Sequence, residues 1–185
     1  ISSLFFLKIL NKRFDNFYLN FFGLFLYVSS PRILGDSFLY KDILFLSFFT
    51  ITLFFFLECI NKISLKNLLC FSLFNALAFN LKIIAVFFPV FFILVLIIKN
   101  FYMNIFYENY KKLIIYFLSF LFFIFIFWPY LWENPFLKFV ELFTSIKTDL
   151  VYVKIFYFDK YIPNAFLPNT YIINWIFISS PIFQI

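Results

Sequence analysis

The sequence predicts an all-α membrane protein, a polytopic bundle of about seven transmembrane spans or part-spans. Of the 185 residues, 65% are hydrophobic and only 13% are charged, whereas soluble domains are about half apolar and about a quarter charged. The apolar residues gather in long runs that short polar clusters separate. Polar and apolar residues do not alternate within these runs, as they would in the strands of a membrane β-barrel, so we expect helices.

Seven apolar runs account for the predicted spans. In order, they are residues 1–10, 17–30, 43–60, 68–79, 83–98, 113–131 and 171–185. A helix needs about 20 residues to cross the hydrocarbon core, so the third and sixth runs qualify fully. The fourth and fifth are either two tilted spans that meet near Lys82 or one broken hairpin. We expect residues 1–185 to be a single transmembrane domain of a longer protein, with the first and last runs cut by the ends of a fragment.

The placement of charge gives these runs a topology. If each run is a span, the loops at 11–16, 61–67 and 99–112 share one side and carry seven basic and two acidic residues. The loops at 31–42 and 132–170 share the other side and carry six of each. Basic residues favour the cytoplasmic side, so we expect the second set to lie outside a plasma (inner) membrane. The net charge of +6 then follows from topology and not from nucleic-acid binding.

The outer loop at 132–170 contains a predicted interfacial helix. Between residues 135 and 149, apolar side chains recur at helical spacing and polar side chains occupy the opposite stripe. The apolar set is Phe136, Phe139, Val140, Phe143 and Ile146, and the polar set is Lys138, Glu141, Ser145 and Thr148. Such a helix is expected to lie in the membrane interface, beside an aromatic belt formed by Trp128, Tyr130 and Trp132.

The composition excludes several kinds of chemistry. The chain has no histidine, which excludes a histidine base, a Ser-His-Asp triad and a histidine-ligated metal. Its two cysteines, Cys59 and Cys70, have the spacing of neither a metal site nor a disulfide framework. No metal site is predicted, and a divalent cation cofactor stays an open question because carboxylates bind such ions.

The short outer loop at 31–42 holds the most informative polar residues. Arg32, Asp36, Lys41 and Asp42 bring two bases and two acids together there. Arginine can donate two parallel hydrogen bonds to a phosphate, and lysine can bind a phosphate through its point charge. A carboxylate can orient an acceptor hydroxyl. The structural alternative is that Asp42 caps the following helix and Arg32 reaches towards lipid head groups.

Three further charged residues are candidates. Lys82 stands between two apolar runs, where a lysine is either functional or simply reaches the interface from a minimal loop. Glu133 is an outer-loop candidate, and its alternative role is favourable charge at the start of the interfacial helix. Glu58, near the cytoplasmic end of its span, is expected to pair with Lys62 at i+4.

Residues 30–42, SPRILGDSFLYKD, resemble a stretch of the bacterial polytopic glycosyltransferases. These are similar to the dolichyl-phosphate-mannose–protein mannosyltransferases and the lipid A aminoarabinose transferases of the GT-C superfamily. The stretch WPYLWENP at 128–135 and the aromatic, proline-containing tail at 157–181 resemble them too, so the resemblance covers most of the chain. It implies an enzyme that takes a sugar from a polyprenyl-phosphate donor on the extracytoplasmic face and passes it to a protein, lipid or glycan acceptor.

The resemblance also implies roles for individual residues. It makes Asp42 a catalytic acid and Arg32 and Lys82 donor-phosphate ligands. Asp36 and Lys41, the other acid and base of the loop at 31–42, complete the predicted catalytic and phosphate-binding sets. Glu133 and Tyr171 stand as outer-loop and acceptor residues. The principal acid of such enzymes lies in an outer loop one span upstream of Ile1. The residues Pro168-Asn169-Thr170-Tyr171 depart from the expected proline followed by Trp-His-Tyr, in a region that concerns acceptor contacts.

Two alternatives come from other functional classes. A transporter or lipid flippase predicts polar residues and helix breakers within the spans, and here only Pro89 and Asn75 fit that description. The third reading is a non-catalytic membrane protein.

Overall fold

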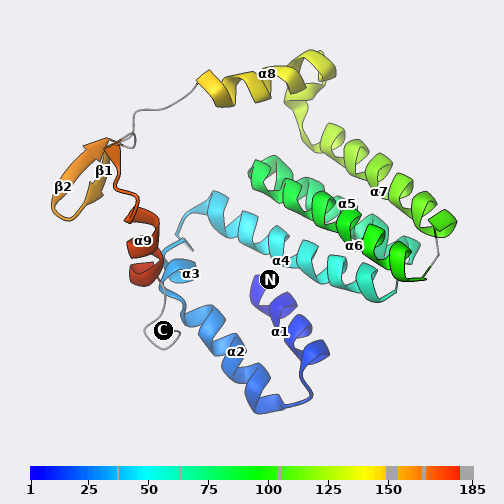
Figure 1. The fold of residues 1–185 in the computed structure, drawn as a ribbon, viewed down its shortest axis with the longest axis horizontal. Helices are drawn as coiled ribbons and strands as arrows, with labels where there is room; N and C mark the ends of the chain where they lie inside the picture. Colours follow the sequence, from blue (N-terminus) through cyan, green and yellow to red (C-terminus); the bar gives the residue numbers. More distant parts are fainter. Residues whose placement is uncertain (37, 63, 104–105, 149–153, 164–165, 180–185) are drawn as a thin grey trace. The chain divides into compact units, whose positions relative to one another are not determined.

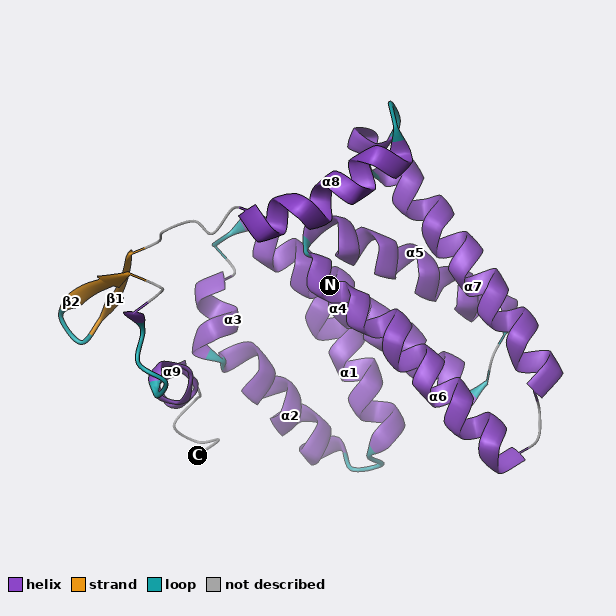
Figure 2. Ribbon diagram, turned by 45° about the horizontal axis from the view of Figure 1, so that its top comes forward, coloured by secondary structure: helices purple, strands orange, loops and turns teal. Residues whose placement is uncertain are grey.

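The computed structural model describes residues 1–36, 38–62, 64–103, 106–148, 154–163 and 166–179. Helices make up 81% of the described residues, which confirms the helical class (Figures 1 and 2). The longer elements are α1 (Ser2–Arg13), α2 (Phe17–Ser29), α4 (Tyr40–Asn61), α5 (Leu65–Leu81), α6 (Phe87–Met103), α7 (Phe106–Phe127), α8 (Pro135–Thr148) and α9 (Tyr171–Ser179). Short helical turns form α3 (Pro31–Asp36), η1 (Ile83–Val86) and η2 (Pro129–Leu131).

Among the described residues, two helices are long and apolar enough to cross a membrane. They are α4, over Tyr40–Asn61, and residues Tyr110–Phe127 of α7, which correspond to the third and sixth predicted spans. Only 28% of the apolar window of α4 and 17% of that of α7 is buried within the described structure. Most of the apolar surface of α4 and of α7 is therefore not covered by other described residues and needs some other apolar environment. The remaining apolar helices are shorter, and their lengths do not confirm a bundle of seven spans.

The fourth and fifth apolar runs form separate helices. Ser64 caps α5 by accepting a hydrogen bond from the backbone N–H of Asn67 at 3.2 Å. Helix α5 ends where Lys82 adopts an extended conformation, with φ −145° and ψ 126°, and η1 begins at the next residue. The break predicted near Lys82 is thus a true helix end, with Lys82 as the C-cap residue of α5.

The chain divides into two compact units, and the first comprises residues 1–29 and 33–129. Helix α5 packs against both α4 and α7, and α1 packs against α4 and α2 (Figure 1). The core of this unit is aromatic: the ring of Phe71 on α5 stacks on Tyr116 of α7 at 4.7 Å and meets Phe92 of α6 at 5.3 Å. Such pairs contribute beyond their buried area, so they hold α5, α6 and α7 in register.

The second unit comprises residues 30–32 and 130–185. Helix α8 confirms the helix predicted at 135–149, and only Asp149 of that range falls outside the described residues. The unit also contains an antiparallel hairpin, β1 (Lys154–Tyr157) and β2 (Lys160–Pro163), which the purely helical prediction did not include. Its strands have four residues each, too few to give a clear alternating pattern. Its turn uses Phe158 and Asp159 at positive φ, where Asn-Gly would have signalled a hairpin.

Candidate functional site

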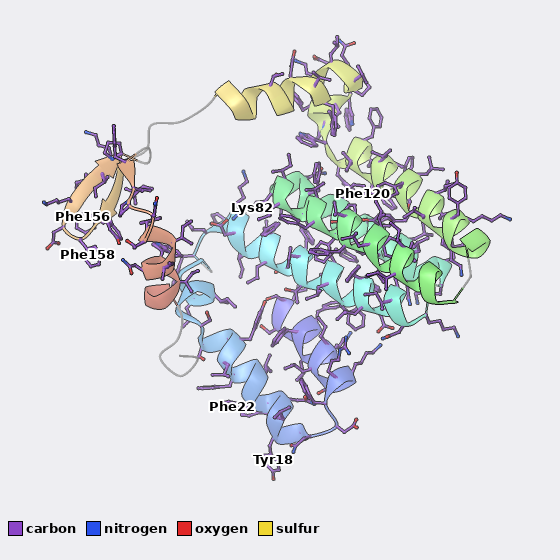
Figure 3. The ribbon with its side chains drawn as sticks, viewed as in Figure 1. Tyr18, Phe22, Lys82, Phe120, Phe156 and Phe158 are labelled. Carbon is purple, nitrogen blue, oxygen red and sulfur yellow. The ribbon has the colours of Figure 1, made fainter. Side chains whose placement is uncertain are left out.

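The structure brings two of the predicted site residues together, Asp42 and Lys82. The Nζ atom of Lys82, whose side chain is labelled in Figure 3, forms an ion pair with Oδ1 of Asp42. The two side chains are 42% and 25% exposed. The same Nζ lies 5.2 Å from the centroid of the Phe45 ring. Asp42 and Phe45 are three positions apart on α4, so they share one face of the helix and contact one ammonium group together.

Asp42 does not cap α4, so the capping alternative is wrong. The N-cap of α4 is Leu39, which makes no side-chain cap hydrogen bond. Asp42 lies in the first turn, where the helix dipole favours a carboxylate. Its side chain is free to turn towards α5 because it is not needed by the backbone N–H groups of its own helix. The carboxylate therefore belongs to a contact between two helices.

The Asp42–Lys82 pair can still bind other groups. A half-exposed ion pair in water contributes only roughly 0.2–1 kcal/mol, so it is a weak device for stability alone. An ammonium group has three N–H donors, and a carboxylate has two oxygen atoms. Lys82 thus keeps donors for an incoming anion, and Asp42 keeps a second oxygen for a hydroxyl. The pair has the composition of a site that holds a phosphate next to a hydrogen-bond acceptor.

The other predicted site residues are more scattered. Lys41 is exposed and lies one position before Asp42 in the first turn of α4. Arg32 and Asp36 belong to α3, but their side chains lie outside the described part of the structure. Glu133 is exposed in the second unit, just after η2.

Tyr171 begins α9 in the second unit and is held by the hairpin. Its ring meets that of Tyr157 at 5.3 Å between centroids. The hydroxyl of Tyr157 accepts a hydrogen bond from Nδ2 of Asn174 at 2.6 Å, one turn further along α9. The hairpin therefore fixes the N-terminal turn of α9, and with it the side chain proposed for acceptor contacts.

A polar cluster that sequence reasoning missed joins η2 to α8. The hydroxyl of Tyr130 donates to Oε2 of Glu141 at 2.8 Å, and Nζ of Lys138 donates to the same oxygen at 3.1 Å. Lys138 also lies 4.9 Å from the Tyr130 ring centroid. The hydrogen bond from Tyr130, followed by Lys138, holds the pKa of Glu141 below its usual value. Bonding to Glu141 raises the pKa of both Tyr130 and Lys138.

The far end of α4 carries a second lysine–acid–phenylalanine contact. Lys12 of α1 forms an ion pair with Glu58 and lies 5.2 Å from the Phe54 ring centroid. The predicted pair between Glu58 and Lys62 is therefore wrong: the partner comes from another helix, and Lys62 lies beyond the last turn of α4 in extended conformation. The spacing i+4 identified a possible partner, but packing of α1 on α4 supplied a different one.

The two ion pairs mark the ends of a stretch of α4 without charges. Sixteen positions separate Asp42 from Glu58, and none between them is charged. This stretch spans about 24 Å at 1.5 Å per residue. The hydrocarbon core of a bilayer is about 30 Å thick. Charged groups near the two ends of such a stretch are placed where the polar head groups of a bilayer begin.

Helices α5 and α7 share a seam of polar side chains in their middle. Nδ2 of Asn75 donates to the hydroxyl of Tyr116 at 2.7 Å, and Oγ of Ser119 donates to Oγ of Ser72 at 2.8 Å. Asn75 and Tyr116 are both fully buried. Within the described residues, Oδ1 of Asn75 has no hydrogen-bond partner. From the sequence, Asn75 is only a polar residue within an apolar run, because its partner Tyr116 lies on another helix.

Neither a metal centre nor a known relative adds to this picture. Within the described ranges, no three acidic or cysteine side chains gather where they would hold a metal ion. No protein-family model, curated protein or solved structure matches the chain. The fold and the site define a class: a mostly helical protein with two helices suited to crossing a membrane.

Proposed function

We propose that this chain is part of a multi-pass protein of the inner (plasma) membrane that transfers a sugar from a polyprenyl-phosphate donor on the extracytoplasmic face. The observation that carries the proposal is the Asp42–Lys82 pair at the N-terminal end of α4. An uncharged stretch of about 24 Å separates it from the opposite charged end. The excess of basic residues in the alternate loops favours a cytoplasmic location for that opposite end.

About seven spans are proposed, which include the two candidate spans and the shorter apolar helices. The shorter helices α2, α5 and α6 are apolar, and α2 and α6 expose several phenylalanine and leucine side chains. Helix α5 exposes Leu65 and Leu69 and is otherwise largely buried. Lipid is the solvent that accepts such surfaces without penalty. Helix α8 has exposed apolar side chains at Phe136, Leu137 and Val140, which suit a helix lying in the interface.

The chemistry at the outer end is a displacement at the anomeric carbon of the donor sugar. The oxygen of the acceptor hydroxyl bonds to that carbon and its proton passes to a carboxylate base. The bond between the carbon and the phosphate oxygen breaks, and polyprenyl phosphate leaves with the electron pair and one more negative charge. Lys82 would stabilise that developing charge through its remaining N–H donors.

The other candidates divide the remaining tasks. Asp42 is a positioning residue in this scheme, because one of its oxygens holds Lys82 over the site. Asp36 is the proposed base. Arg32 and Lys41 add positive charge for the donor phosphate in the same outer segment. Glu133 and Tyr171, in the second unit, are proposed to contact the acceptor.

Retention of a lipid phosphate by the purified chain tests the proposal. The protein in detergent is incubated with radiolabelled undecaprenyl phosphate, and the bound label is counted after gel filtration. We expect Lys82→Gln to weaken retention by about tenfold, the loss of one charge-assisted hydrogen bond. Lys66→Gln is the matched control, because Lys66 lies at the start of α5 and away from Asp42. Equal retention by the two variants and the wild type would refute the role of Lys82.

A transporter is the second candidate, and the polar seam between α5 and α7 favours it. Buried polar side chains within spans mark substrate pathways in many transporters, and Asn75 has an unpartnered oxygen in the middle of α5. Solute counterflow into liposomes that contain the chain would support this candidate. Retention of lipid phosphate that depends on Lys82, without counterflow, would exclude it in favour of the transferase.

A further inference from the structure

A pocket of about 150 Å³ lies between the last turns of α1 and α4, at the end of α4 opposite to Asp42. Seven side chains line it: Ile9, Lys12, Arg13, Phe54, Leu57, Glu58 and Asn61. Its volume corresponds to about five water molecules at roughly 30 Å³ each. The pocket thus has room for a phosphate and the first atoms of the chains attached to it, and not for a whole acyl chain.

The charges in this pocket do not cancel. Lys12 is engaged by Glu58 and by the ring of Phe54, so its charge is already balanced. Arg13 lies in the last turn of α1 and, among the described residues, has no ion-pair partner. The pocket therefore carries a net charge of +1, which suits one anionic group. Asn61, at the end of α4, adds an amide donor at the same level.

The lining of the pocket changes character from one end to the other. Ile9, Phe54 and Leu57 lie towards the middles of their helices and form an apolar wall. Arg13 and Asn61 lie at the ends of the helices, where the pocket is polar. An amphiphile with a phosphate above apolar chains matches this order, whereas a free phosphate would leave the apolar wall uncovered.

We infer that this pocket binds the phosphate of an anionic phospholipid, with the guanidinium of Arg13 as its main ligand. Arginine is suited to this task because its planar fork donates two parallel hydrogen bonds to phosphate oxygens. Basic pockets between transmembrane helices on the cytoplasmic side hold anionic head groups, and the loop 11–16 is one of the three basic loops expected on that side. The bound lipid would join α1 to α4 next to the Lys12–Glu58 pair.

The inference rests on the proposed insertion of α4 in a membrane, but it does not rest on glycosyl transfer. Arg13 lies at the opposite end of α4 from Lys82, so the two sites respond to different substitutions. Arg13→Gln should leave undecaprenyl phosphate retention unchanged, and Lys82→Gln should leave anionic phospholipid retention unchanged. Failure of one site is thereby distinguishable from failure of the other.

Native mass spectrometry of the delipidated full chain tests the site. The protein is titrated with phosphatidylglycerol and, separately, with phosphatidylcholine of the same acyl chains. We expect phosphatidylglycerol to bind preferentially and Arg13→Gln to weaken its binding by about tenfold, the effect of one charge-assisted hydrogen bond. Arg13→Lys should bind phosphatidylglycerol more tightly than Arg13→Gln but less tightly than the wild type. Lysine keeps the positive charge but lacks the planar guanidinium that donates two parallel hydrogen bonds.

The matched control is Lys62→Gln, which removes one positive charge just beyond α4 at a position that does not line the pocket. It should retain wild-type binding. Equal losses in Lys62→Gln and Arg13→Gln would overturn the inference in favour of general charge attraction. Wild-type binding by Arg13→Gln, with its helical circular dichroism intact, would also overturn it. Displacement of the lipid by inorganic phosphate at the same low concentration would assign the pocket to free phosphate instead.

Discussion

Removing one hydroxyl from the polar seam between α5 and α7 should destabilise the first unit measurably. Tyr116→Phe keeps the ring stacked on Phe71 at 4.7 Å and on Phe120 at 5.9 Å, so it creates no cavity. It removes the acceptor of the 2.7 Å hydrogen bond from Nδ2 of Asn75. Oδ1 of Asn75 is already without a partner among the described residues, so the whole buried amide would then be unsatisfied.

The expected cost is about 1–2 kcal/mol. A buried polar group left without a partner costs about 1–3 kcal/mol, whereas hydrogen bonds between transmembrane helices average only about 0.6 kcal/mol with a maximum near 1.7. Replacing both partners by apolar groups is nearly neutral, because no polar group remains to be satisfied. The double variant Asn75→Leu with Tyr116→Phe should therefore be more stable than Tyr116→Phe alone.

Steric trapping in micelles, or unfolding by increasing SDS mole fraction, measures these differences. The wild type, both single variants and the double variant form a double-mutant cycle. If the double variant regains most of the unfolding free energy that Tyr116→Phe loses, the result would support a seam whose polar groups depend on one another. If the losses of unfolding free energy in the two single variants simply add in the double variant, the reasoning is refuted. A Tyr116→Phe variant as stable as the wild type would also refute it, because the polar seam would then not contribute to stability.

Two other predictions concern the second unit. Phe158 and Asp159 have φ values of 45° and 59°, a conformation that costs a residue with a side chain roughly 1–2 kcal/mol. Asp159→Gly should therefore raise the protection of hairpin amides from hydrogen exchange, and unchanged or lower protection would count against the turn geometry. The pKa of Glu141 is depressed in the folded state, so its contribution is complete above the unfolded value of about 4.3 and is lost as pH falls through the folded value. Emission from Trp132, with the other tryptophans replaced by phenylalanine, should change at acidic pH in the wild type and not in Glu141→Gln; the same acidic step in both would contradict the assignment.

These helices could be predicted from the sequence because the local spacing of apolar residues indicates them. Continuous apolar runs located α4 and α7, and the period of apolar residues located α8 over all of its described residues. The hairpin was not predicted because its strands are short and its turn lacks glycine or asparagine. A turn formed by residues at positive φ is held by its surroundings, which a local pattern does not record.

The pairing of charged residues was the part that sequence could not supply. Asp42 and Lys82 were each identified, but forty positions separate them and only the packing of α5 on α4 brings them together. Glu58 had a local candidate in Lys62, yet the contact with α1 gave it Lys12 instead. Local spacing identifies which charges are unusual, whereas the choice of partner depends on which helices meet.

The orientation of α4 across a membrane is the central claim, and labelling of single cysteines at its two ends tests it most directly. The background is a variant with Cys59 and Cys70 replaced by alanine, into which Lys41→Cys or Lys62→Cys is introduced. A membrane-impermeant maleimide is applied to intact cells and then to cells opened by detergent. We predict that the cysteine at position 41 reacts in intact cells and that the cysteine at position 62 reacts only after opening. Reaction of both positions in intact cells, or of neither until the cells are opened, would contradict the account.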